Sequence, residues 1–310
     1  MLSKVAERVY WTGRYLERIE STARLITIYD TLLFDLPRSV EISWYNLILI
    51  NGIEDSFLER YSVKDEKNVV KFLIADTTNS SSIVSSLNAV RENVRTTRDV
   101  VLQDTWELVN ELNLFVKENV QQGVGRKQRH EFLEEIIKGC QQILGLLFGN
   151  MTQDAPWRFL SLGRNLERAD MTTRILEAGV KAYSDLADED AAVNTRQIIL
   201  GQVLRSLNAD QSYRRIVRSK VNATEVVEFL LENPQFPRSI LYCHKALVEH
   251  AKPLPSATRL LDEMAMLENK IGKIKAAKLN EKLPDHLNWL QLRHINIHTI
   301  ICETWFPAWE

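Results

Sequence analysis

The phrase GRYLERIESTARLI begins at Gly13, and the phrase GRNLERADMTTRIL begins at Gly163. Polar and apolar residues in both phrases recur every three to four positions, which is the period of an α-helix. At about 100° per residue, the first copy gives a polar stripe that includes Arg14, Glu17 and Glu20, with apolar residues on the opposite side. The repeated phrase therefore predicts two amphipathic helices of the same design.

A second internal match lies further along the chain. The stretch VKFLIADTTNSSSIVSSLNAVREN from Val70 aligns without gaps on VEFLLENPQFPRSILYCHKALVEH from Val227. The two matches occur in the same order, and their offsets differ by about two helical turns. In each copy a serine, Ser82 or Ser239, stands where the N-cap of the following helix is expected. We infer an internal duplication with pseudo-repeats 1–150 and 151–310.

The distribution of helix-breaking residues predicts an all-α fold. Only 8 prolines and 11 glycines interrupt the 310 residues, and the segments between them carry apolar residues at helical spacing. Nothing between Met151 and Trp157 is typical of a flexible linker. We therefore expect one domain over 1–310, a single large helical bundle whose two duplicated halves share a core around a pseudo-two-fold axis.

Composition and charge argue against several classes of partner. The 39 Lys and Arg against 41 Asp and Glu give a net charge of −2, which offers no electrostatic attraction toward nucleic acid or an anionic membrane. The richest apolar stretch, from Ile136, is interrupted well before the roughly 20 residues of a membrane span. The first residues lack a secretory signal, and the three cysteines form no disulfide pattern. We expect a cytoplasmic protein with no nucleic-acid and no membrane partner.

Both copies of the repeated phrase carry arginine at the same three places and an acid at the same two. Arginine differs from lysine in its planar fork of donors, which suits bidentate pairing with carboxylate or phosphate. The charges either form a partly buried ion network that fixes the register of the two helices, or line a cleft that binds an anion, with Glu17 or Glu167 as a catalytic acid/base. The candidate residues are Arg14, Glu17, Arg18, Glu20, Arg24, Arg164, Glu167, Arg168, Asp170 and Arg174.

Two further charged clusters add candidates. The phrase VRENVRTTRD follows a serine-rich N-cap, and a cationic stripe is less natural in the front half of a helix than near its C-terminus. A solvated helix face is the competing interpretation of such a run. The phrase DQSYRR is a third cluster, of low specificity by itself. The ligand-binding candidates from these clusters are Arg91, Glu92, Arg95, Tyr213 and Arg214.

The sequence offers little support for metal or cofactor chemistry. The Glu-x-x-His spacing of di-metal carboxylate bundles is absent, as are the Walker A, GxGxxG and GxSxG phrases. His294, His298 and Cys302 recur at one helical face near the C-terminus, but isoleucines between them favour an ordinary packed helix over a metal site. We expect neither a metal nor a cofactor.

At the phrases AERVYWTGRYLERIESTARLI, VRENVRTTRD, DQSYRR and NPQFPRSILYC, the sequence resembles the alpha-E family of all-helical bacterial proteins. The resemblance covers the chain from Leu2 to about Cys243 and is loose after Ala251. It implies association with a circularly permuted ATP-grasp-like ligase and a transglutaminase-like protein. That association in turn implies a part in making or modifying a peptide-like amide product.

The resemblance also implies site residues. The charged motif of the family falls on Arg14, Glu17, Arg18 and Glu20, and its Arg-Glu-Asn-x-Arg phrase falls on the residues Arg91, Glu92, Asn93 and Arg95. The chain departs from the usual pattern at Val90, where alanine is more common, and at Asn233, where an acidic residue is more common.

Three hypotheses follow. The first is a helical component of an ATP-dependent amide-bond-forming system that binds the ligase, or an anionic peptide-like substrate, through the repeated Arg/Glu cleft. The second is an enzyme in its own right that acts on a carboxylate- or phosphate-bearing substrate, with Glu17 or Glu167 as acid/base. The third is a purely structural ion network.

Overall fold

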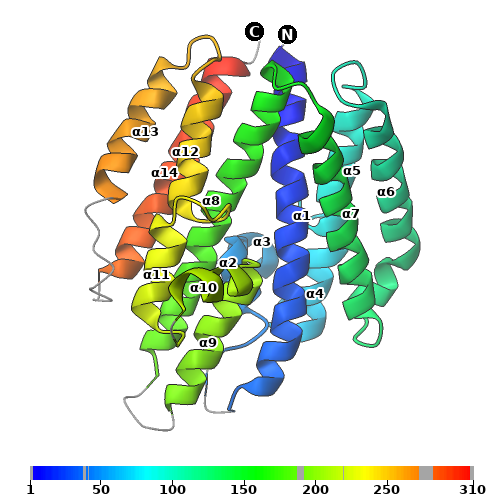
Figure 1. Cartoon of the computed structure of the whole chain (residues 1–310). Helices are drawn as coiled ribbons and strands as arrows, with labels where there is room; N and C mark the ends of the chain where they lie inside the picture. Colours follow the sequence, from blue (N-terminus) through cyan, green and yellow to red (C-terminus); the bar gives the residue numbers. More distant parts are fainter. Residues whose placement is uncertain are drawn as a thin grey trace.

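Helices α1 (Ser3–Asp35) and α8 (Ala155–Ser184) carry the two copies of the repeated phrase and run side by side in the same direction through the middle of the molecule (Figure 1). The computed structural model describes residues 3–37, 40, 42–186, 192–218, 220–271 and 282–307. Helix α8 begins where Asp154 caps it by accepting a hydrogen bond from the backbone N–H of Trp157, with Pro156 in the first turn.

The two central helices touch backbone to backbone at the glycines that open the repeated phrase. A β-carbon on Gly13 would lie less than 3.0 Å from the carbonyl oxygen of Leu160, and one on Gly163 would lie less than 3.0 Å from that of Tyr10. No other residue type lets two helices approach this closely, because every other side chain begins with a β-carbon. The contact is reciprocal and fixes the register of α1 against α8.

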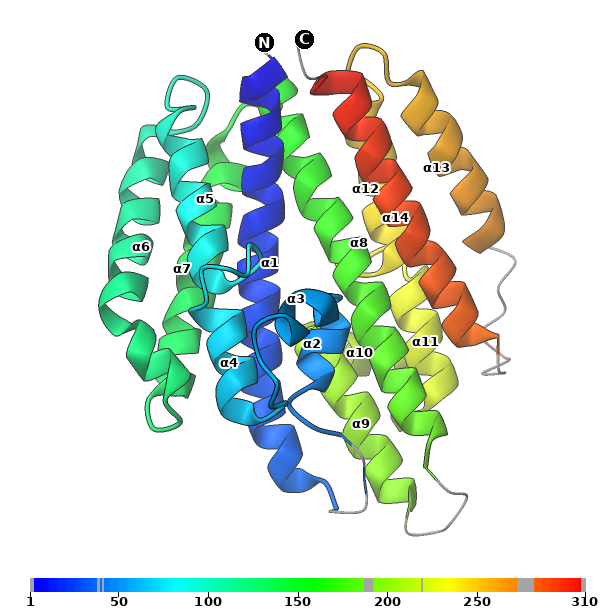
Figure 2. The ribbon, with the colours of Figure 1, turned by 180° about the vertical axis from the view of Figure 1, so that it is seen from behind.

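The remaining helices are arranged on the two sides of this central pair (Figure 2). Helices α5 and α7 pack on α1, with α6 outside them, and helices α12 and α14 pack on α8, with α13 outside them. The bounds on the first side are α4 (Glu66–Ile74), α5 (Ile83–Arg95), α6 (Gln103–Val124) and α7 (Arg129–Asn150). Those on the second side are α9 (Ala192–Ser206), α11 (Ala223–Glu232), α12 (Ile240–Ala251), α13 (Thr258–Ile271) and α14 (Leu283–Trp305).

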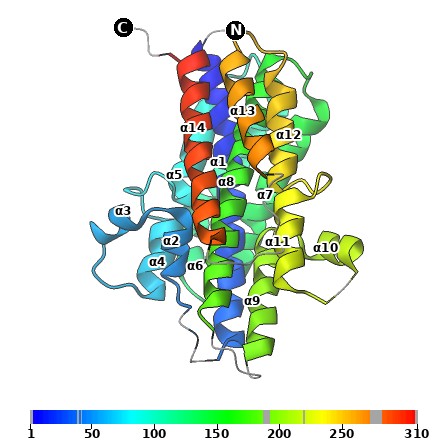
Figure 3. The same ribbon diagram turned by 90° about the vertical axis from the view of Figure 1, so that its left-hand side faces the viewer.

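Three short helices complete the fold and cover opposite faces of the central pair. Helices α2 (Asn46–Asn51) and α3 (Glu54–Leu58) lie on one face, and helix α10 (Asp210–Val217) lies on the other (Figure 3). Helix α2 ends at Gly52, whose φ of 65° is the left-handed conformation that glycine adopts at helix ends.

The all-α class predicted from the sequence is confirmed, since all the secondary structure across the described ranges is helical. The two predicted N-caps are confirmed as well: Ser82 accepts from the backbone N–H of Ser85, and Ser239 accepts from that of Tyr242, each at 3.1 Å. The internal duplication stays a prediction. The buried apolar side chains form a cluster that draws on both halves of the chain. None of the helices in the described ranges is long and apolar enough to cross a bilayer.

Candidate functional site

Glu17 lies at the centre of the molecule, fully buried, and receives arginines from the other half of the chain. Arg168 donates from Nε to Glu17 Oε2 at 2.8 Å, and Arg164 donates from Nε to the same oxygen at 3.4 Å. Arg238, in the turn before α12, donates from Nη1 to Glu17 Oε1. Three guanidinium groups therefore surround one carboxylate.

Glu167 has the reciprocal arrangement on α8. Arg14 donates from Nε to Glu167 Oε2 at 2.6 Å, and Arg18 donates from Nε to Oε1 at 2.6 Å and from Nη2 to Oε2 at 3.1 Å. Each central carboxylate is thus bound by the arginines of the opposite helix. The ion pairs between the two copies of the phrase run between α1 and α8, as the network interpretation expects.

A second tier of ion pairs lies one turn further along each helix. Arg24 donates to Glu20 Oε1 at 2.8 Å, and Arg174 donates from Nε to Asp170 Oδ2 at 2.8 Å. Both pairs have i,i+4 spacing, which brings side chains together on one helix face. Glu20 also accepts from Arg238 Nη2 at 3.2 Å, so the second tier joins the first.

The central carboxylates are ionised at neutral pH. Burial by itself raises the pKa of Glu17, but the charges of Arg168, Arg238 and Arg164 outweigh it and lower the pKa to about 2. Burial likewise opposes ionisation of Glu167, and Arg18 and Arg14 lower its pKa to about 2. A carboxylate with so low a pKa is a poor proton donor or acceptor near pH 7. The geometry therefore favours anchoring the arginines over acid/base catalysis.

These pKa values predict a loss of stability in acid. The folded-state pKa of Glu17 and Glu167 is depressed from 4.5 to about 2, so their stabilising contribution is complete above about pH 4.5 and is lost as the pH falls toward 2. We expect the urea midpoint of the protein to fall steeply through this window. In a Glu17→Gln, Glu167→Gln variant the same pH titration should be flatter; an equally steep titration would contradict the assignment.

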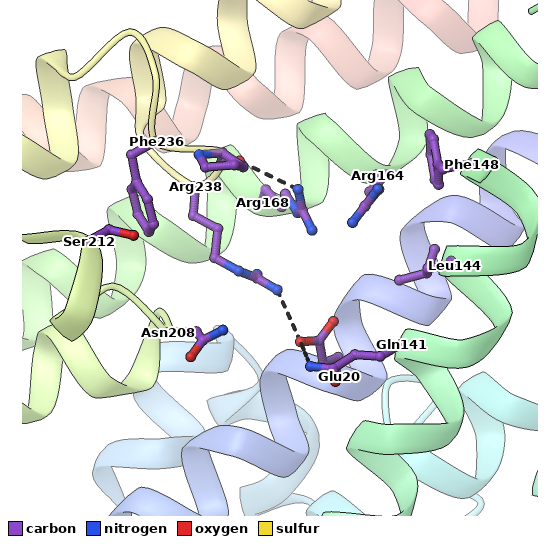
Figure 4. Close-up of a pocket in the computed structure, with 12 residues that line it drawn as sticks. Glu20, Gln141, Leu144, Phe148, Arg164, Arg168, Asn208, Ser212, Phe236 and Arg238 are labelled. Carbon is purple, nitrogen blue, oxygen red and sulfur yellow. Dashed lines mark hydrogen bonds and ion pairs between the residues drawn. The ribbon is translucent and has the colours of Figure 1, made fainter.

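A cavity of about 510 Å³ opens beside the Glu17 network, and we call it the arginine cavity (Figure 4). The guanidinium groups of Arg164, Arg168 and Arg238 point toward the same space, across from Glu20. The remaining walls come from α7, the α9–α10 connection, α10 and the turn before α12. The lining residues are Glu20, Gln141, Leu144, Gly145, Phe148, Arg164, Arg168, Asn208, Ser212, Phe236, Pro237 and Arg238.

Arg164 is the least satisfied cation of this cavity. Its side chain is 21% exposed, it reaches Glu17 only through Nε, and its two Nη groups have no hydrogen-bond partner among the described residues. Its guanidinium carbon lies 4.4 Å from the ring centroid of Phe148, which is a cation–π contact. Burial, together with the positive charges of Arg168 and Arg238, lowers the pKa of Arg164 to about 10. The cavity therefore carries an excess of positive charge.

A second, smaller cavity of about 280 Å³ lies beside the Glu167 network, and we call it the histidine cavity. It is formed by α1, α2, α8, α14 and the turn before α5. Its lining residues are Arg14, Arg18, Asn51, Gly52, Ile53, Ser81, Glu167, Asp170, Met171, Arg174, His294, Ile295 and His298.

Six predicted ligand-binding residues line neither cavity: Arg24, which pairs with Glu20 on α1, and five residues of α5 and α10. On α5, Arg95 pairs with Glu92 at the surface, and Arg91 donates from Nε to Asn110 Oδ1 at 2.7 Å. The structure therefore places this cluster against α6 and does not bring it to the repeated phrase. On α10, the predicted pair Tyr213 and Arg214 is likewise separate: Tyr213 is buried and donates to Glu225, and Arg214 pairs with Asp210 at the surface.

The ligand-binding residues predicted from the sequence leave out Arg238, His294 and His298, which lie near the central network. Arg238 is the largest omission, because it contacts both Glu17 and Glu20. Its signal was the phrase NPQFPR directly before the N-cap Ser239, which brings an arginine to the start of a helix that packs on α8. His294 and His298 sit on α14, where isoleucines at the intervening positions suggested simple packing; they line the histidine cavity.

The sequence favours an ordinary packed helix over a metal site at His294, His298 and Cys302 on α14, and the structure shows the partners of these three residues. His294 turns toward His244, with 2.9 Å between their Nε2 atoms, and His298 contacts Tyr10 Oη through Nδ1 at 2.9 Å. Cys302 Sγ lies 3.7 Å from the His298 ring nitrogens. Within the described part of the chain, no three His, Cys, Asp or Glu side chains gather in a way that could hold a metal ion.

Comparison with known proteins places the chain in a family. The family model Alpha-E, described as a predicted alpha-helical domain with a conserved ER motif, matches residues 1–306. The chain belongs to the Alpha-E family. Glu-Arg dipeptides occur in both copies of the repeated phrase, at 17–18 and 167–168, so in this Alpha-E protein each such pair contributes to the central network.

Curated relatives of this Alpha-E protein include uncharacterised mycobacterial proteins. One from Mycobacterium bovis is 25% identical over 289 residues, which cover 84% of this chain and 31% of that protein. One from Mycobacterium tuberculosis strain H37Rv is 24% identical over 289 residues, with the same coverage. The chain thus spans about a third of the length of these relatives (31%). No solved structure matches the chain.

Proposed function

We propose that this Alpha-E protein binds a carboxylate-bearing, peptide-like ligand in the arginine cavity, as the helical component of an ATP-dependent amide-bond-forming system in the cytoplasm. The carboxylate belongs either to a small substrate or to a segment of an ATP-grasp-like ligase. The resemblance of the repeated phrase to the alpha-E pattern supports the ligase and transglutaminase-like partners, and the chemistry of the cavity supports the ligand.

The observation that carries the proposal is that the Nη groups of Arg164 lack hydrogen-bond partners among the described residues. Its two Nη groups offer donors beside an open cavity, and Arg168 and Arg238 add positive charge that Glu17 and Glu20 only partly compensate. A bound carboxylate would accept two parallel hydrogen bonds from such a guanidinium, which is the geometry that makes arginine the usual carboxylate-binding residue. It would also relieve the mutual repulsion of the three cations.

The size and lining of the cavity favour a peptide-like ligand over a bare inorganic anion. A volume of about 510 Å³ falls in the usual range for small organic ligands, roughly 300–1,000 Å³. Leu144, Phe148 and Phe236 provide apolar walls beside the arginines. Gln141 and Asn208 carry side-chain amides that can pair with the amide groups of a short peptide.

A thermal-unfolding screen tests the proposal. We expect N-acetylated short acidic peptides to raise the melting temperature of the protein by a few degrees, since a ligand at a hundred times its Kd adds about 2.7 kcal/mol to stability. The increase should vanish in Arg164→Met and persist in the matched control Arg95→Met, which alters a surface arginine of α5. ATP with magnesium and inorganic phosphate complete the panel.

Three outcomes would contradict the proposal. One is a peptide effect that survives in Arg164→Met, and another is the absence of any effect from the peptides. The third is an equal effect from inorganic phosphate, which would indicate a general anion site without peptide recognition. For the ligase partner, the measurement is ligase turnover with and without this protein: stimulation that is lost in Arg164→Met supports the partnership, and unchanged turnover contradicts it.

A further inference from the structure

The histidine cavity differs from the arginine cavity in its chemistry as well as its position. The arginine cavity is bounded by α7 and α10, whereas the histidine cavity is bounded by α2 and α14, on the opposite face of α1 and α8 (Figure 3). Where the arginine cavity adds a third guanidinium from Arg238, the histidine cavity adds two imidazoles from α14. The histidine cavity therefore has hydrogen-bond donors at one end and acceptors at the other.

The donor end of the histidine cavity is formed by Arg18 and Arg174. Arg174 uses Nε to bind Asp170 Oδ2, and its two Nη groups have no partner among the described residues. Gly52 makes room for that guanidinium, because a β-carbon there would lie 2.6 Å from Arg174 Nη1. Arg18 uses Nη1 only for a long 3.4 Å contact to Ser81 Oγ. Both side chains retain donors for a carboxylate.

The opposite end of the cavity is formed by Asp170, whose carboxylate accepts hydrogen bonds, and by His294. Asp170 Oδ1 and His294 Nδ1 are buried 3.9 Å apart, and neither has a hydrogen-bond partner among the described residues. Burial, with the charges of Arg174 and Arg14, lowers the pKa of His294 to about 3. The same causes, burial first and then Arg14, lower the pKa of His298 to about 4. The two imidazoles are therefore neutral at physiological pH, and Asp170 Oδ1 is a buried acceptor without a hydrogen-bond partner among the described residues, although Oδ2 of the same carboxylate pairs with Arg174.

We propose that the histidine cavity binds the zwitterionic head group of a free α-amino acid, with its carboxylate on Arg18 and Arg174 and its ammonium on Asp170 Oδ1. An anion without an ammonium group would leave Asp170 Oδ1 without a hydrogen-bond partner and would be repelled by it. A buried polar group without a partner makes the binding free energy less favourable, because it has lost its hydrogen bonds to water. A cation without a carboxylate would be repelled by the positive charges of Arg18 and Arg174. A zwitterion satisfies both ends at once.

The volume of the cavity agrees with a ligand of this size. About 280 Å³ lies just below the roughly 300 Å³ at which pockets for larger organic ligands begin. Ile53, Met171 and Ile295 supply an apolar wall for a side chain. This inference concerns a different cavity from the proposed function and does not depend on it.

Calorimetric titration of the unaltered protein tests the inference without any variant. The probes are glycine, L-alanine, L-leucine and L-glutamate, each compared with its N-acetyl derivative, which lacks the ammonium, and its amide, which lacks the carboxylate. We expect at least one free amino acid to bind roughly tenfold or more tightly than both derivatives, since a charge-assisted hydrogen bond is lost in each case. Equal binding of the free and the N-acetylated form, or no binding of any free amino acid, overturns the inference.

Variants then locate the site. Asp170→Asn should weaken binding of the free amino acid roughly tenfold or more. Asp210→Asn is the matched control, because Asp210 pairs with Arg214 at the same i,i+4 spacing on α10 and lines neither cavity. Ile295→Trp, at a half-exposed position in the cavity wall, should block binding without touching the ion network. Loss of amino acid binding in Arg164→Met, or its retention in both Asp170→Asn and Ile295→Trp, would place the ligand elsewhere and overturn the inference.

Discussion

Glu17→Gln is expected to lower the free energy of unfolding by about 3–5 kcal/mol, because it removes the buried carboxylate that pairs with three arginines, one of them buried and two partly buried. Glutamine keeps the shape of the side chain but not its charge. Arg164, Arg168 and Arg238 would then repel one another in a buried site, where that repulsion is much stronger than in water. Urea denaturation followed by circular dichroism measures the change.

The matched control for Glu17→Gln is Glu92→Gln on α5. Glu92 pairs with Arg95 at the surface, where water screens the interaction, so we expect no measurable change in stability. If the two variants were equally mild, the central carboxylate would contribute little to the fold. The buried network would then have to be explained by ligand binding alone.

Alanine at either central glycine is expected to destabilise the protein by about 3 kcal/mol, at the upper end of the usual cost of overpacking. The new β-carbon of Gly13→Ala or Gly163→Ala would press on a backbone carbonyl of the opposite helix, which cannot turn aside as a side chain would. The two helices must then separate, which also lengthens the ion pairs between them. The melting temperature should fall by roughly 4–6 °C.

Gly145→Ala on α7 is the matched control for the central glycines. It also replaces a glycine inside a helix, but a β-carbon there would meet nothing within 4 Å. Alanine should stabilise the protein by about 0.5–1 kcal/mol, since it restricts the unfolded chain and favours the helix. If Gly13→Ala and Gly163→Ala were as stable as Gly145→Ala, this result would contradict the close backbone contact between α1 and α8 at the two glycines.

The sequence predicts the helical class and the two central helices well, because both depend on local periodicity and capping. It predicts the environment of α1 less well. Arg14, Glu17 and Glu20 are buried on one side of the helix, and Leu16 and Ile19 are buried on the other. Charged residues are almost never buried unless they are paired. The charged stripe of α1, taken by itself, therefore predicts a face exposed to solvent. Only the pairing with α8, which is not local, explains why the stripe is inside.

Contacts between residues far apart in the sequence also decide which predicted site residues line a cavity and which do not. Arg91 and Arg164 are both arginines of charged helices, and each has a polar partner close in space. The partner of Arg91 is Asn110 on the neighbouring helix, whereas that of Arg164 is Glu17 on a helix far away in the sequence. Arg238 was missed because its role depends on the packing of a turn against the central helices.

The ion pairs between α1 and α8 also limit when the central helices can pack together during synthesis on the ribosome. The hydrogen bonds between the arginines of one copy of the repeated phrase and the glutamates of the other join residues separated by 147 to 153 positions, and the contact of Glu17 with Arg238 spans 221. A nascent first half therefore emerges with Arg14, Arg18 and Glu17 before their partners have been synthesised. Burying these charges alone is costly. The central pair of helices accordingly closes late, once most of the chain has left the exit tunnel.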